Sequence, residues 1–176
     1  MTRATRRGAV RVVIVAAAAA VLAVAGVGPA TATPAARPAA CPAGQLHGSF
    51  TDLQGSTGHY HAVLVVRNVG AGPCTLFGYP ALQMFDAAGQ PLTTSVTPDH
   101  FLGRARRVLL RRGARASSAL TWVEIPPEPC VTPAHVGVTP PGATTSLTLL
   151  WPPQHNLVCG DGAIDATPFL RGVPRL

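Results

Sequence analysis

The chain has 176 residues and a formal net charge of +7, with 14 basic residues, all arginine, against seven carboxylates. So few acids leave no carboxylate pair placed for acid–base catalysis, and no serine lies in a nucleophile elbow, so we expect no catalytic residues. An aromatic content of 5% also argues against nucleic acid as a partner, because single strands are bound by aromatic stacking as well as by charge.

The first 32 residues have the pattern of a secretory signal peptide. Residues 1–11 carry four arginines and no acid, residues 12–27 are uncharged and rich in Ala and Val, and Ala30-Thr31-Ala32 supplies a small-residue cleavage site. The apolar run is short of the roughly 20 residues that cross a membrane, so no transmembrane span is expected after cleavage. The pattern leaves open Sec or twin-arginine export and whether the leader is cleaved or retained.

Cleavage after Ala32 would leave one domain preceded by a short linker. Residues 33–40 are rich in Pro and Ala, which is typical of an extended linker, and we place a single β domain at residues 41–172. This mature part keeps ten arginines against seven carboxylates, a net charge of +3. The expected location is secreted or at the cell envelope.

Four cysteines, Cys41, Cys74, Cys130 and Cys159, predict two disulfides in an exported chain. Three pairings are possible. Pairing neighbours would close loops of about 30 residues, each worth about 3.7 kcal/mol in the chain-entropy treatment. No two of them form a Cys-x-x-Cys pair, which argues against a redox or zinc site at these cysteines.

Beyond the linker, 18 prolines and 18 glycines divide the sequence into segments that are mostly too short for helices. Composition and period-two alternation predict strands instead. In chain order they are 45–50, 59–68, a strand of two runs (74–77 and 81–85) bent at Gly78-Tyr79-Pro80, 92–95, 106–111, 116–125, 135–139, 146–151 and 163–169.

Turn residues predict how these strands connect. Asp86 to Gly89 is a predicted hairpin turn whose glycine suits a positive φ, and Arg112-Gly113-Ala114 is predicted to join 106–111 and 116–125 as a second hairpin. The Tyr79 hydroxyl is expected to hydrogen-bond to backbone at its corner. Eight or nine short strands of this kind indicate an all-β, antiparallel sandwich or barrel.

Several segments resemble the DUF4232-type family of secreted actinobacterial domains of unknown function. They are VLVVRNVG at 63–70, PCTLFGYPALQMFDAAGQPL at 73–92, ALTWVEI at 119–125 and VTPPGATTSLTLLW at 138–151. The resemblance covers Cys41 to about Pro168. It implies an immunoglobulin-like β-sandwich with a Cys41–Cys74 disulfide, which leaves Cys130–Cys159, and it brings no activity with it.

The most basic segment is the candidate binding patch. It holds six of the ten mature arginines: Arg104, Arg106, Arg107, Arg111, Arg112 and Arg115. Guanidinium groups suit bidentate contact with phosphate or carboxylate. We therefore expect an anionic envelope polymer, a lipid surface or another exported protein as partner, the alternative being a solvated hairpin tip that only aids solubility.

A second hypothesis concerns metal. His59 and His61 point to the same side of a predicted strand, about 7 Å apart, and would suit copper or zinc if a third ligand such as His47 or His100 converged on them. The sequence fixes no third ligand, and no cofactor is expected.

Overall fold

The computed structural model describes residues 37–125 and 129–172, which belong to one compact unit, Ala36–Leu176. The predicted signal peptide lies outside the described residues. In the two described stretches, no helix has the length and apolarity needed to cross a bilayer.

The larger of the two main sheets contains six strands, all paired antiparallel except β11 with β5. The order across the sheet is β1 (Leu46–Ser56), β2 (His59–Asn68), β7 (Arg115–Val123), β11 (Ala163–Ala166) and β5 (Ser95–Pro98), with β12 (Leu170–Arg171) also paired to β7.

All but one of the remaining strands form two smaller antiparallel sheets. The last one makes isolated bridges to Val158 and Cys159. One sheet is β10 (Leu147–Leu150), β9 (His135–Thr139) and β4 (Ala81–Phe85), and the other is β3 (Cys74–Leu76) with β6 (Val108–Leu110). The short elements are η1 (Ala43–Gln45), β8 (Cys130–Val131) and α1 (Cys159–Gly162).

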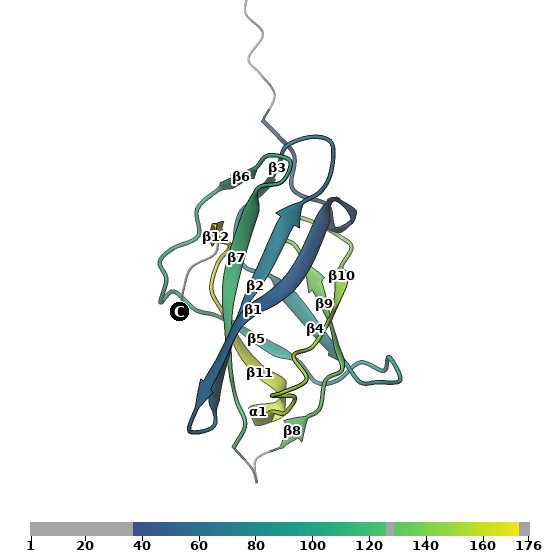
Figure 1. Cartoon of the computed structure of the whole chain (residues 1–176), viewed down its shortest axis with the longest axis vertical. Coiled ribbons are helices and arrows are strands. Elements are labelled where there is room, and N and C mark those ends of the chain that lie inside the picture. Colours follow the sequence, from purple (N-terminus) through teal and green to yellow (C-terminus); the bar gives the residue numbers. More distant parts are fainter. Residues whose placement is uncertain (1–36, 126–128, 173–176) are drawn as a thin grey trace, which may run out of the picture. The chain divides into compact units, whose positions relative to one another are not determined.

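The six-stranded and three-stranded sheets pack their apolar faces on one core (Figure 1). Alternate residues of β2, such as Leu64 and Val66, meet Met84 of β4 and Val136 of β9 in a single buried cluster. The fold is therefore all-β and mostly antiparallel, as the alternation predicted.

The strand count of the described residues is twelve, above the eight or nine expected. Two extra strands, β8 and β12, are only two residues long. The corner at Gly78-Tyr79-Pro80 also separates β3 and β4 into different sheets, so the predicted bent strand is two strands with different partners.

Both disulfides have the pairing that the family resemblance implied. Cys41–Cys74 ties the N-terminal segment to β3 with a Cα–Cα distance of 4.8 Å, and Cys130–Cys159 ties β8 to α1 at 3.8 Å. Each holds an edge of the fold that little secondary structure fixes.

The predicted hairpin at Arg112-Gly113-Ala114 is wrong. β6 pairs with β3 and β7 pairs with β2, so the glycine turn carries the chain from one sheet to another. A residue distant in sequence fixes this turn, because the Gly113 N–H donates to the Asn68 carbonyl at 2.7 Å.

The turn after β4 forms as expected, but the strand after it lies later than predicted. Gly89 has φ +78° and its N–H donates to the Asp86 carbonyl at 3.1 Å. The chain then returns beside β4 through a bridge from Phe85 to Pro91 and a hydrogen bond from the Met84 N–H to Thr94 Oγ1, and crosses to the large sheet as β5.

Candidate functional site

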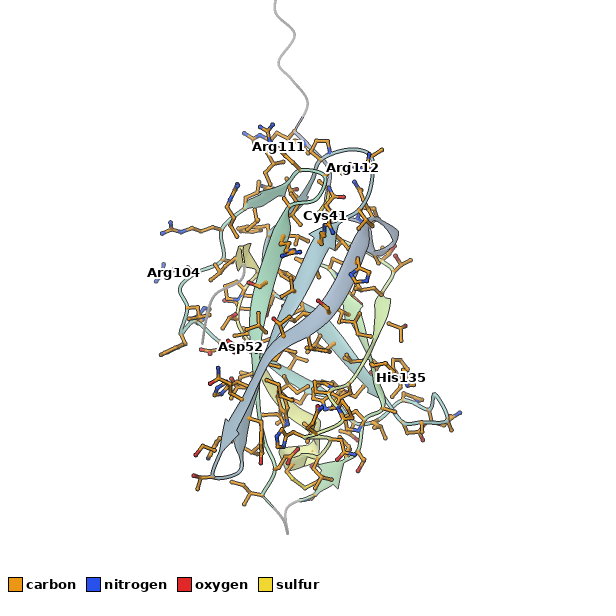
Figure 2. All side chains as sticks on the ribbon, viewed as in Figure 1. Cys41, Asp52, Arg104, Arg111, Arg112 and His135 are labelled. Carbon is orange, nitrogen blue, oxygen red and sulfur yellow. A yellow bond between two sulfur atoms is a disulfide. The ribbon has the colours of Figure 1, made fainter. Side chains whose placement is uncertain are left out.

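All six predicted patch arginines are exposed, but they form two groups. Arg104, Arg106 and Arg107, the loop arginines, lie in the connection between β5 and β6. Arg111, Arg112 and Arg115, the turn arginines, surround the glycine turn that leads into β7. Figure 2 shows Arg111 and Arg112 at the same end as Cys41, with Arg104 pointing outward from the side loop.

These guanidinium groups have no carboxylate partner among the described residues. The ion pair seen there joins His155 and Glu124, and no acid occurs between His100 and Val123. Six exposed cations in twelve residues, with no carboxylate partner among the described residues, concentrate positive potential on this part of the surface.

A seventh arginine, Arg67, joins the turn arginines. In the strand register Arg67 of β2 lies directly opposite Arg115 of β7, with His47 of β1 on its other side. A Cβ placed on Gly113 would lie 3.8 Å from the Arg67 Nη2. The pairing of β2 with β7 brings Arg67 to the cluster.

Asn68 holds the turn that carries these arginines. It is fully buried, its Nδ2 donates to the carbonyls of Leu110 and Gly72, both at 2.9 Å, and its Oδ1 accepts from the Gly70 N–H at 2.9 Å. Its backbone N–H donates to the Ala114 carbonyl at 3.0 Å. The side chain therefore links the end of β2 to the end of β6, and the backbone of the same residue holds the turn.

A shallow hollow of about 420 Å³ borders the turn arginines. It is lined by Pro38, Ala71, Pro73, Leu109, Arg111 and Arg112. An anionic group seated there would meet two guanidiniums above an apolar floor, an arrangement suited to a phosphate or carboxylate.

The loop arginines belong to a segment fixed against the Gly78-Tyr79-Pro80 corner. The Tyr79 hydroxyl lies 2.7 Å from His100 Nδ1, so its partner is a side chain and not the backbone that we predicted. Arg107 places its Cζ 5.5 Å from the ring centroid of Phe77, within cation–π range.

His59 and His61 lie near the far end of the β1–β2 hairpin, opposite Ser56 and Gln54. His47 pairs with Arg67, six residues from His61 along β2 and therefore on the order of 20 Å away. His100 is engaged by Tyr79. Across residues 37–125 and 129–172, no three His, Cys, Asp or Glu side chains gather where they could hold a metal ion.

A cluster of aromatic side chains packs together away from the arginines. Tyr60 stacks on His155 at 3.9 Å between ring centroids, and the His155 ring in turn approaches Glu124 with Nδ1 3.6 Å from Oε2. Trp122 and Trp151 pack beside them, 5.2 Å apart and almost fully buried. These contacts close one end of the core.

A groove with a volume of about 640 Å³ lies between the edge strands β1 and β10. Its lining is mainly apolar, including Phe50, Leu147, Leu149 and Trp151, and no arginine borders it. The groove is therefore separate from the basic surface.

Residues 41–170 match the family model described as "Domain of unknown function (DUF4232)". The comparisons with curated proteins and with solved structures give no match.

Proposed function

The chain belongs to the DUF4232 family, and from this premise we propose that it is an exported, non-catalytic module that binds an anionic partner at the cell envelope. In this proposal the domain is an immunoglobulin-like β-sandwich, and the exposed segment Arg104–Arg115 is its binding surface.

The observation that carries the proposal is the exposure of six arginines that have no carboxylate partner among the described residues. An arginine already paired must lose that partner before it binds another anion, and these need not. Their guanidiniums can each make two parallel hydrogen bonds to a phosphate or carboxylate oxygen pair. If this segment only aided solubility, a mixture of acidic and basic side chains would serve as well as arginines alone.

Two disulfides support an extracytoplasmic location, since such bonds persist in oxidising compartments and are rare in the cytosol. The arginine-rich surface would then face anionic polymers, lipids or proteins of the envelope.

Co-sedimentation with isolated envelopes tests the proposal. We expect retention at low salt and release at high salt, because exposed ionic contacts are screened. Neutralising Arg104, Arg106 and Arg107 to Gln, or the turn arginines to Gln, should each weaken retention about a hundredfold, since one arginine near an anionic surface contributes roughly a fivefold gain.

A matched control carries the same change of net charge elsewhere. Gln90→Glu, Thr144→Glu and Thr145→Glu lie on exposed loops and also lower the charge by three. This variant should retain most of the binding. Salt-insensitive retention, or an equal loss in the control, would reject the arginine surface as the binding site.

A further inference from the structure

The loop His100–Arg107 combines its arginines with a strongly exposed aromatic residue. Phe101 is 86% exposed, the highest value among the exposed large hydrophobic residues, and Phe77 beneath the loop is 56% exposed. Burying a phenylalanine side chain is strongly favourable, so Phe101 would add to the affinity for any partner that offers an apolar layer beside the sites for these arginines.

The exposure of Phe101 is fixed by the loop and is not the result of a loose end. The Gly103 N–H donates to the His100 carbonyl at 2.8 Å, which makes a tight turn with Phe101 inside it, and Gly103 has φ +106°. The Phe101 N–H donates to Asp99 Oδ1 at 2.8 Å. The backbone is therefore shaped to hold the ring outward.

Both ends of the loop are fastened to the same corner of the fold. His100 bonds to Tyr79, and Arg107 lies over Phe77, two residues earlier in the chain. Contacts to two residues of one corner thus hold both ends of the loop. Such a loop loses little conformational entropy when it binds.

The loop is basic around its aromatic residue. Arg104 and Arg106 are exposed and follow Phe101 by three and five residues, so their backbones lie within roughly 18 Å of it. The nearest acid, Asp99, uses one carboxylate oxygen to hold the turn. Exposed positive charge thus lies close along the chain to an exposed apolar group.

We propose that this loop docks the domain on an anionic lipid bilayer, with Phe101 entering the interface and Arg104, Arg106 and Arg107 contacting headgroups. The inference rests on the proposed function and names its partner. A soluble polyanion would satisfy the arginines but leave the phenylalanine in water, whereas a bilayer surface supplies both negative headgroups and an apolar layer beneath them.

The test uses the chain beginning at Thr33, which keeps the compact unit and both disulfides. Phe101→Trp gives a direct readout, because the two native tryptophans, Trp122 and Trp151, are only 2% and 3% exposed. With vesicles of phosphatidylcholine and phosphatidylglycerol, its emission should shift to the blue, and with phosphatidylcholine alone it should not. Leu150→Trp, at a site 73% exposed in β10, is the control and should not shift.

Affinity for the same vesicles separates the two contributions. Phe101→Ser should weaken binding about tenfold or more, as expected for losing one buried aromatic side chain. Neutralising the loop arginines should weaken it about a hundredfold. Binding to inorganic polyphosphate should depend on the arginines and not on Phe101.

The outcomes distinguish the inference from the proposed function. If polyphosphate and vesicles both bind through the arginines while Phe101→Ser equals the wild type and Phe101→Trp shows no shift, the bilayer inference is overturned and a polymer partner stands. If neither probe binds, both proposals fail. A blue shift of Phe101→Trp with anionic vesicles, together with weaker vesicle binding by Phe101→Ser, supports both.

Discussion

Replacing Gly162 with alanine should lower the free energy of unfolding by about 4 kcal/mol or more, the largest effect expected of any single substitution considered in this domain. Gly162 has φ +74°, and a Cβ there would clash with the Thr93 carbonyl oxygen and lie 3.0 Å from the Met84 side chain. Because the first obstacle is backbone, the end of α1 would have to separate from the segment before β5.

Gly89→Ala is the matched control. Gly89 has a similar φ of +78° and nothing within 4 Å of its would-be Cβ, so it isolates the cost of the backbone conformation, about 1 kcal/mol. Urea unfolding of both variants, with disulfides intact, measures the difference. Equal losses in the two would mean that Thr93 does not constrain the turn.

Asn68→Ala should lower the free energy of unfolding by about 3 kcal/mol, because it leaves the buried Leu110 carbonyl and the part-buried Gly70 N–H without the side-chain partner they now have. The Gly72 carbonyl keeps the Gln45 side chain as a donor. The same variant should weaken anion binding by the turn arginines, since the Asn68 side chain holds Leu110, the residue directly before Arg111. Chemical denaturation and envelope retention at low salt would report the two effects.

Gln45→Ala is the comparison for that variant. Gln45 Nε2 donates to the Gly72 carbonyl at 2.6 Å, but that oxygen also accepts from Asn68 and would keep one partner. We expect a loss of about 1 kcal/mol and unchanged anion binding. A loss as large as that of Asn68→Ala would show that the loop, and not the asparagine, is the source of stability.

The bounds of several strands could be predicted from local sequence alone, without knowing which strands they pair with. The segments His59–Asn68, Ala81–Phe85 and His135–Thr139 have the predicted bounds, because alternation or a short apolar run ends at Gly, Pro or Asn in each case. The disulfide pairing came from the family resemblance, since spacing alone left three pairings open.

Long-range pairing could not be predicted in the same way. The runs on either side of Gly113 have the local pattern of a hairpin, yet β6 pairs with a strand some 30 residues earlier in the chain. Alternation of Arg106 with Val108 and Leu110 also extended the predicted strand into a loop. A glycine turn shows that the chain bends, but its partner is set by packing and by contacts such as that from Gly113 to Asn68.

The sequence predicted which residues belong to the candidate site, but not how they are arranged in space. The six arginines were identified from composition, but their division into two groups, the addition of Arg67 and the exposure of Phe101 depend on tertiary structure. An isolated phenylalanine in a loop gives no signal in sequence that separates a buried anchor from an exposed tip.

Site-specific photo-crosslinking in envelopes tests most directly whether the arginine segment contacts a partner. A benzoylphenylalanine would be placed at Ala105, between Arg104 and Arg106, and separately at Gln90, in the exposed turn after β4. The account predicts a crosslinked product from position 105 that disappears at high salt, and none from position 90. Equal labelling at both positions, or labelling at position 90 alone, would contradict it.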